Sequence, residues 1–518
     1  MEENQSNSNQ RIAKNTLILY FRMFITMLVG LYTSRIVLAT LGVSDYGLYN
    51  VVGGLVSMFT FLNGSMAAGT QRFLTFELGR GIILEQKKVF NCSILVHLVL
   101  LLIIIILAET IGLWFLYHKM QIDPVRFNAA IWVYQFSVLA CAISIFQVPF
   151  MATLIAHEKM NIYAYMSIYD VVVKLLIVYL IQIASFDKLV FYAFLILLTN
   201  ISSAAIYNIY CRVHYIETRF SLRFDSVVFK KIFSFSAWDV IGSIASLAQT
   251  QGINIILNMF CGTVINAARG IAVTINNIVM SLVNNFTLAS SPQLVKLYSV
   301  NQIDKMAILS IHMATMSNYL LIVVGIPIFI EIEFLLKLWL IEYPDYTPVF
   351  VRIILIQSFI QSMGTPAMKT LHAIGKIKMM DLIIGSLLVS ILPVSYLLFK
   401  YFNLEPATVM IINIAPWVIT IPIRMILLRR YCDFPASRYM NEVVLKGIVL
   451  TGIIYVMVCI GLSWFQGNEY IRLIFTIILN AILSSLFYLY FGFTKSQRLF
   501  ILNRIINKLH YRNGSKES

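Results

Sequence analysis

Apolar residues fill this chain in long blocks that are separated by short polar stretches. Most blocks run for about 20 residues or more, the length that a helix needs to cross roughly 30 Å of hydrocarbon. In one block, Leu100 to Leu107 are all apolar, whereas a strand of a membrane barrel would alternate apolar and polar positions. Backbone groups inside a bilayer must find hydrogen bonds within their own segment. The pattern therefore predicts an all-α protein that crosses the membrane many times.

The blocks divide into about fourteen predicted membrane-spanning helices, numbered here in chain order. Their approximate cores are residues 15–40, 46–70, 89–116, 127–153, 162–183, 189–211, 232–258, 264–290, 306–330, 347–371, 380–400, 405–428, 442–464 and 471–493. Tight turns are expected near Gly42, between helices 1 and 2, and near Gly262, between helices 7 and 8. Glycine permits such turns and the close approach of the helices that follow.

A basic stretch at residues 215–231 separates six predicted helices from eight. The two parts are weakly alike, since VLATLGVSDYGLYNVVGGL from Val37 and IILNMFCGTVINAARGIAV from Ile255 each join two helices through a turn that contains glycine. Internal repeats of this kind are common in transporters, where the substrate site lies between them. The expected domains are an N-terminal lobe (1–214), the basic linker (215–231), a C-terminal lobe (232–430), two extra helices (431–493) and a basic amphipathic tail (494–518).

Composition and charge agree with a membrane protein and fix its expected orientation. The chain is 59% hydrophobic and 12% charged, with a mean hydropathy of +0.82, which excludes an ordinary soluble domain. Lys and Arg concentrate in alternate loops and in the tail, so both termini are expected to be cytoplasmic. This topology and attraction to anionic lipids account for the net charge of +15 without nucleic acid. The six cysteines form no metal-ligand spacing, and no metal is expected.

Polar residues form stripes on four predicted helices. Helix 7 carries a narrow stripe at Asp239, Ser243, Ser246, Thr250 and Asn254; helix 1 at Asn15, Arg22, Thr26 and Thr33; helix 2 at Asn50, Ser57 and Ser65; helix 8 at Arg269, Asn276, Asn277, Ser281 and Asn284. Helices 3, 6 and 13 show little of this pattern. Small polar residues can simply join helices, but full charges inside a membrane usually face a cavity or a partner. We therefore expect a polar cavity lined by helices 1, 2, 7 and 8.

Charged residues elsewhere in the spans have two interpretations each. Asp170 and Lys174 on helix 5 are four residues apart, which favours an ion pair over a site of ion coupling. Asp239 on helix 7 is a second candidate for ion coupling or an ion pair, and H⁺ or Na⁺ would be the coupling ion. Near the first tight turn, Arg35 is expected to reach the membrane edge or to pair with Asp45.

Two motifs indicate a family. The turn RIVLATLGVSDYGLYNVV, from Arg35, and GTQRFLTFELGRG, from Gly69, together with the helix layout, resemble polysaccharide transporters of the multidrug/oligosaccharidyl-lipid/polysaccharide exporter superfamily, the Wzx-type flippases. The resemblance covers nearly the whole chain. It implies two six-helix bundles that face a central cavity, as in MATE proteins, plus two C-terminal helices. It also implies the bacterial inner membrane as the location.

The resemblance further implies a function without an enzymatic step or a cofactor. Such proteins flip an undecaprenyl-diphosphate-linked oligosaccharide by alternating access, for O-antigen or capsule synthesis. Besides the glycan and membrane lipids, the expected partners are the polysaccharide polymerase and the chain-length machinery. By position, Arg22 and Arg269 are candidates to hold the diphosphate. The full set of expected cavity residues is Arg22, Thr26, Asn50, Arg269, Asn277 and Asn284.

Two other functions remain open from the sequence. A multidrug or cation antiporter of the same fold would use a carboxylate, such as Asp239 or Asp170, for ion coupling. A membrane glycan polymerase or glycosyltransferase would need a large outer loop or an acidic catalytic motif. The sequence offers only the acidic group Glu331, Glu333 and Asp345 on a short outer segment, and isolated charges there are usually solvated.

Overall fold

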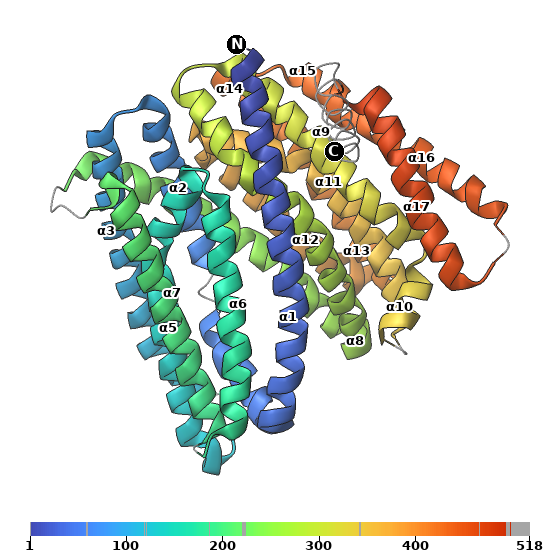
Figure 1. Ribbon diagram of the computed structural model, residues 1–518. Helices are drawn as coiled ribbons and strands as arrows, with labels where there is room; N and C mark the ends of the chain where they lie inside the picture. Colours follow the sequence, from blue (N-terminus) through green and yellow to red (C-terminus); the bar gives the residue numbers. More distant parts are fainter. Residues whose placement is uncertain are drawn as a thin grey trace, which may run out of the picture. The chain divides into compact units, whose positions relative to one another are not determined.

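The computed structural model describes residues 2–57, 61–118, 120, 122–185, 187–219, 224–340, 343–402, 404–465, 467–493 and 498. Helices make up nearly all of this part of the chain, and it contains no strand (Figure 1). Twelve helical segments within it are long and apolar enough to span a membrane, and they coincide with predicted helices 3 to 14. The first two predicted helices fall on α1 and α2. The all-α membrane fold is therefore confirmed.

The helices follow one another with short connections. They are α1 (Glu2–Ser57), α2 (Phe61–Arg80), α3 (Ile83–Leu107), α4 (Leu113–His118), α5 (Phe127–Ala156), α6 (Met160–Ile183), α7 (Lys188–His214), α8 (Ser226–Ser299), α9 (Ile303–Ile330), α10 (Ile332–Leu340), α11 (Thr347–Ile374), α12 (Lys378–Phe402), α13 (Pro406–Ile412), α14 (Ile414–Cys432), α15 (Ala436–Tyr439), α16 (Lys446–Ser463) and α17 (Glu469–Phe487). Single π turns join α3 to α4 and α15 to α16.

Both predicted glycine turns are present, and their backbones match. α1 is interrupted at Gly42 (φ 79°, ψ 166°) and α8 at Gly262 (φ 82°, ψ −179°). This region of backbone space is accessible essentially to glycine alone. The same rare conformation at corresponding places of the two halves agrees with the internal repeat that the sequence suggested.

The chain divides into two compact units. The N unit comprises residues 12–244 and 295–301, and the C unit comprises residues 1–11, 245–294 and 302–518. The predicted boundary lay in the basic linker, whereas this division falls inside α8. The predicted tail, 494–518, lies outside the described residues apart from Arg498, whose Nε donates to the Leu489 carbonyl at 2.8 Å.

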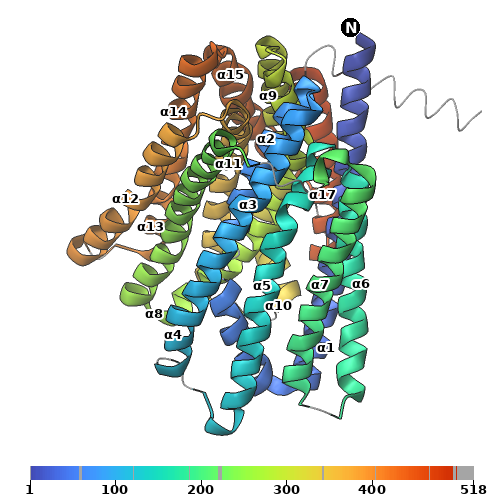
Figure 2. The ribbon, with the colours of Figure 1, turned by 90° about the vertical axis from the view of Figure 1, so that its left-hand side faces the viewer.

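The N unit is built around α5, which packs against α2, α3 and α7. Figures 1 and 2 show α5, α6 and α7 side by side. Phe90 on α3 and Phe150 on α5 are fully buried and meet edge to face, with ring centroids 5.4 Å apart. This packing fixes α5, the central one of the three helices that carry the site described below.

The C unit is built around α9 and α11, with α17 fastened to α9. The buried carboxylate of Glu331 accepts hydrogen bonds from Arg472 Nε (3.0 Å) and Thr476 Oγ1 (3.1 Å), both on α17. On the same helix, Asn480 Nδ2 donates to the Val323 carbonyl at 2.9 Å. Glu331, which the sequence placed in an outer acidic group, thus anchors the last spanning helix.

Candidate functional site

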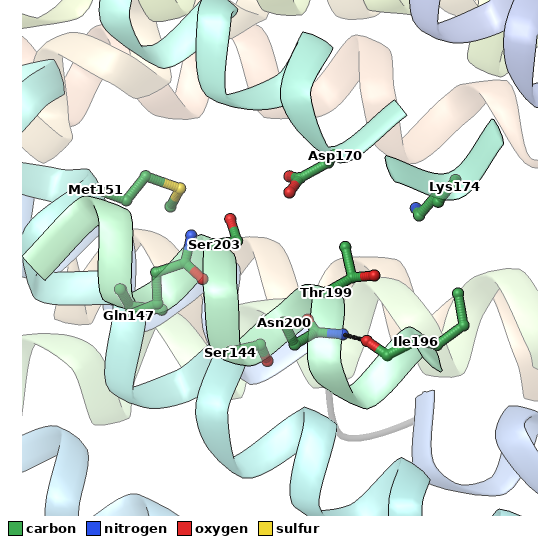
Figure 3. A pocket seen from close by; sticks show the side chains of 10 residues that line it. Ser144, Gln147, Met151, Asp170, Lys174, Ile196, Thr199, Asn200 and Ser203 are labelled. Atoms are coloured by element: carbon green, nitrogen blue, oxygen red, sulfur yellow. Dashed lines mark hydrogen bonds between the residues drawn. The ribbon is translucent and has the colours of Figure 1, made fainter. Parts of the chain in front are cut away.

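A polar cavity of about 310 Å³ lies inside the N unit, between α5, α6 and α7 (Figure 3). Ten residues line it: Ser144, Gln147, Val148 and Met151 from α5, Asp170 and Lys174 from α6, and Ile196, Thr199, Asn200 and Ser203 from α7. Most of these residues have side-chain oxygen atoms, and all of them lie within the membrane-spanning helices α5, α6 and α7. The cavity therefore brings a carboxylate, hydroxyls and amides together inside the bundle, beside the apolar side chains of Val148, Met151 and Ile196.

Asp170 is the carboxylate of this cavity. Its Oδ1 atom is buried and makes no hydrogen bond of ordinary geometry among the described residues, and the Ser203 hydroxyl and the Lys174 ammonium group are the polar groups that interact with this carboxylate. Carboxylate, hydroxyl and amide oxygens are the ligands that hard cations prefer. A carboxylate in such a place can also take up a proton. An ionisable residue inside a membrane protein that faces a cavity is by default a functional candidate.

Lys174 lies one turn further along α6 and lines the same cavity. Figure 3 shows the Lys174 side chain apart from the Asp170 carboxylate, and no ion pair joins these two side chains. The structure thus brings Asp170 and Lys174 together in one cavity without the direct pair that their spacing favoured.

Arg22 and Thr26 face α6 and their own helix. Arg22 Nη1 donates to Ser167 Oγ at 3.3 Å, and its guanidinium lies 4.8 Å from the centre of the Tyr163 ring. Thr26 Oγ1 donates to the Met23 carbonyl at 3.0 Å. Asp239 is half-buried in the N-unit part of α8. The side chain of Asn50 lies outside the described residues.

The remaining predicted residues lie on α8 in the C unit. Arg269 is 4% exposed, and its Nη1 donates to Asn254 Oδ1, while its buried Nε has no partner in the described part of the chain. Asn277 and Asn284 are exposed on the surface of their unit. The helix 7 and helix 8 stripes therefore meet at the Arg269–Asn254 contact.

The C unit contains a buried chain of amides that the sequence did not single out. Gln249 Nε2 donates to Asn413 Oδ1 at 2.6 Å, and Asn413 Nδ2 donates to Gln357 Oε1 at 3.1 Å. Gln249 and Asn413 are 3% and 5% exposed. These groups satisfy one another without a charge. The three residues come from distant parts of the chain, on α8, on α11 and between α13 and α14, so they give no local sequence signal.

A buried arginine of the C unit was also missed. Arg424 on α14 is 4% exposed, and its Nε has no hydrogen-bond partner among the described residues. Its guanidinium lies over Gly364 of α11, where an added Cβ would come within 2.5 Å of Arg424 Nη1. In the sequence Arg424 lies close to Arg429 and Arg430 at the end of its helix. It therefore resembles the loop charges that set the orientation of a helix in the membrane.

Asp45 in the first tight turn binds a different arginine from the one expected. Its carboxylate receives Nε (2.9 Å) and Nη2 (2.5 Å) of Arg126, whose Nη1 also contacts Asp187 Oδ2 at 2.5 Å. Burial alone would raise the pKa of Asp187, but hydrogen bonds from Arg126 and from the Val190 and Leu189 N–H groups hold this pKa below its ordinary value. The side chain of Arg35 is not among those described.

Comparison of the structure with solved proteins identifies its architecture. A MATE protein in complex with MaL6 has a TM-score of 0.70 and 14% identity, covering 84% of this chain and 97% of that chain. An outward-facing multidrug resistance MATE transporter of the MOP superfamily has a TM-score of 0.70 and 14% identity, and the match covers 82% of this chain and 96% of that chain. The chain has the MATE fold.

A third MATE-fold neighbour is a MOP superfamily transporter from Pyrococcus furiosus, described by the reverse polarity of its binding pocket and a suggested different function. Its TM-score is 0.68 at 14% identity, covering 83% of this chain and 96% of that chain. No family model matches the sequence, and no curated protein matches it. At this level of identity the MATE likeness establishes the fold, and the chemistry of the site must be argued from the residues themselves.

Proposed function

We propose that this protein is a transporter that works by alternating access and flips an undecaprenyl-diphosphate-linked oligosaccharide across the bacterial inner membrane. The observation that carries the transport part is a MATE fold with the half-buried carboxylate of Asp170 in a cavity of the N unit. The glycan part is supported by the turn from Arg35 and the motif from Gly69, which resemble Wzx-type flippases.

The buried cations support an anionic substrate. Arg269 and Arg424 are each 4% exposed in the C unit, and each has a buried Nε without a partner among the described residues. Arginine offers a planar fork of donors that matches phosphate oxygens. Within the MATE fold, the Pyrococcus furiosus neighbour is described as having a pocket of reverse polarity. We propose Arg22 and Arg269 as diphosphate ligands, because they lie on the polar stripes of helices 1 and 8.

Asp170 supplies the coupling step in this proposal. H⁺ or Na⁺ would bind at the carboxylate and leave when the transporter changes state, since a charge at this depth is costly without a partner. The polymerase and chain-length machinery would receive the exported glycan.

A multidrug or cation antiporter is the second candidate. The cavity around Asp170 favours it, because a carboxylate among polar side chains could bind a cationic substrate as well as a coupling ion. Both candidates share the fold, so the substrate decides between them.

A deletion strain of the source bacterium tests the proposal. We expect loss of the surface polysaccharide and accumulation of its lipid-linked repeat unit, both restored by the wild-type protein. Arg22→Lys should restore export in part because it retains the charge, and Arg22→Ala should not, at matched protein level. Unchanged glycan display with increased sensitivity to cationic drugs would instead establish the antiporter.

A further inference from the structure

The turn between α5 and α6 has an unusual backbone. Glu158 has φ 59°, a left-handed conformation that is uncommon for a residue other than glycine. The turn is closed by hydrogen bonds from Glu158 N to the Ile155 carbonyl and from Lys159 N to the Leu154 carbonyl, both 2.9 Å. Strained backbone persists where its surroundings hold it, and it is concentrated at functional places.

Three distant segments are tied to this turn. Asn15 Nδ2 of α1 donates to the Glu158 carbonyl at 3.2 Å. His157 Nε2 contacts Glu217 Oε1 at 2.5 Å, in the linker after α7. Glu158 Oε1 contacts Lys296 Nζ at 2.6 Å, near the end of α8. The Glu158 side chain is 1% exposed, whereas that of Lys296 is 28% exposed, so a buried carboxylate is balanced by a cation that reaches the surface.

Lys296 belongs to a short segment that lies between two stretches of the C unit in the sequence but packs with the N unit. Residues 295–301 are part of the N unit, although the chain enters them from the C unit and returns to the C unit after them. α2 also holds this segment. A Cβ at Gly79 would overlap Ser299 Oγ and lie 3.3 Å from Lys296 Cα, and the rings of Phe76 and Tyr298 are 6.2 Å apart.

We propose that the Glu158–Lys296 ion pair is a latch that holds residues 295–301 to the N unit in one state of the protein and opens in another. The ion pair joins one strained residue to one lysine, and it adds a charge-dependent contact to the packing of α2 against the segment. Opening is feasible because Lys296 already reaches the surface. The turn also lies at the ends of α5 and α6, where water can hydrate the Glu158 carboxylate once the ion pair breaks. The purpose of the latch rests on the proposed transport cycle, but its existence does not.

The reactivity of a cysteine placed at Ser299 tests the latch. Ser299→Cys is introduced into purified, reconstituted protein from which the six native cysteines have been removed, and its rate of labelling by a water-soluble maleimide is measured. Glu158→Gln removes the charge and keeps the side-chain size. Glu158→Asn also removes the charge but tolerates the left-handed backbone better. Both should raise the labelling rate by roughly tenfold, the effect of about 1.4 kcal/mol on an open–closed equilibrium.

Matched controls separate the latch from general loosening. Glu85→Gln breaks the Glu85–Lys88 pair (2.7 Å) of the same unit and should leave labelling unchanged. The charge swap Glu158→Lys with Lys296→Glu should return the rate toward that of the parent. A second background keeps only Cys141, which is 6% exposed in the interior of the N unit, and its labelling should stay slow in every variant.

Two results would overturn the proposal. One is an unchanged Ser299→Cys labelling rate in folded Glu158→Gln and Glu158→Asn proteins. The other is a rise at Cys141 equal to the rise at position 299, which would mean that the pair only supports folding. Neither measurement uses a glycan or a drug, so a wrong assignment of the substrate would leave the latch result intact, and failure of the latch would leave the glycan experiment intact.

Discussion

The N unit and the C unit share a glycine turn between two helices, but they differ in the polar and charged residues that they bury. Each has a glycine turn of the same rare backbone conformation, at Gly42 and at Gly262. The N unit then places the carboxylate of Asp170 in a polar cavity, whereas the C unit buries the neutral amides of Gln249 and Asn413. The C unit also buries Arg269 and Arg424. The N unit is thus distinguished by a carboxylate in its cavity, and the C unit by two buried arginines.

The contrast predicts its largest effect at Asp170. Asp170→Asn keeps the shape of the side chain and removes its ability to bind a cation or to take up a proton, so ion-dependent transport should be abolished while the protein folds normally. Transport into proteoliposomes with an imposed H⁺ or Na⁺ gradient measures this effect.

Two variants serve as comparisons for Asp170. Asp304→Asn, on the exposed first turn of α9, should transport normally. Gln249→Glu would place a carboxylate in the amide chain of the C unit and should lower stability without creating ion dependence, because this position is 3% exposed and the charge would be buried among neutral amides. Full ion-coupled transport by Asp170→Asn would remove the functional difference between the units.

The next largest effect concerns Arg424 and Gly364. Gly364→Ala should destabilise the C unit by up to about 3 kcal/mol, because the added methyl group meets the buried guanidinium of Arg424. In an Arg424→Ala background the same substitution should cost much less, and thermal unfolding of the four proteins gives the coupling energy. Gly325→Ala, whose Cβ would make an ordinary contact of 3.5 Å with Leu321, is the control. Equal costs in both backgrounds would mean that Arg424 does not occupy this position.

Sequence was sufficient for the fold because membrane spans are set by length and hydrophobicity, which are local properties. The glycine turns were predictable for the same reason, since a short turn between two apolar blocks requires residues such as Gly42 and Gly262. The outer connections were less predictable. Asp45 was expected to pair with nearby Arg35, but it binds Arg126, about 80 positions away, through contacts that only the packing of α5 creates.

The candidate site was predictable only where its signal lay within one helix. Asp170 and Lys174 were noticed because a charge pair four residues apart is visible on one helix face. Predicted helix 6 showed little polar character in the sequence. In the structure this helix is α7, and it supplies Thr199, Asn200 and Ser203 to the cavity. Their small polar side chains carry no charge, and their role depends on which neighbouring helix they face. Tertiary packing supplies that information.

Because the two glycine turns share one backbone conformation, replacing either glycine with alanine should lower the stability of the protein by the same amount. Gly42→Ala and Gly262→Ala should each destabilise the protein by about 2 kcal/mol, because alanine is strained at the positive φ angles found there. Gly30→Ala and Gly270→Ala, at helical positions with open space around the added Cβ, should be neutral or slightly stabilising. Thermal unfolding in detergent measures all four. A cost at one turn alone would break the structural equivalence of the units.

The smallest effect is expected at Asp187, which lies in the N unit just before α7. Asp187 accepts from Leu189 N at 3.0 Å and Val190 N at 3.2 Å, and so caps α7, besides binding Arg126. Asparagine can also cap a helix. Asp187→Asn therefore removes the charge alone, and because the ion pair is partly exposed we expect a loss below about 1 kcal/mol.

The pH dependence of this loss identifies its cause. The folded pKa of Asp187 lies below its ordinary value of 3.8, so the ionised carboxylate stabilises the protein above pH 3.8, and this contribution disappears as the pH falls through the lower folded pKa. The unfolding temperatures of the wild type and Asp187→Asn should thus differ at pH 6 and approach each other as the pH falls below 3.8. Asp123→Asn, which removes an exposed capping acid outside the ion pair, is the matched control. A constant difference for Asp187→Asn at all pH values would assign the loss to the helix cap, and the Asp45–Arg126–Asp187 contacts would then hold the first turn by geometry and not by charge.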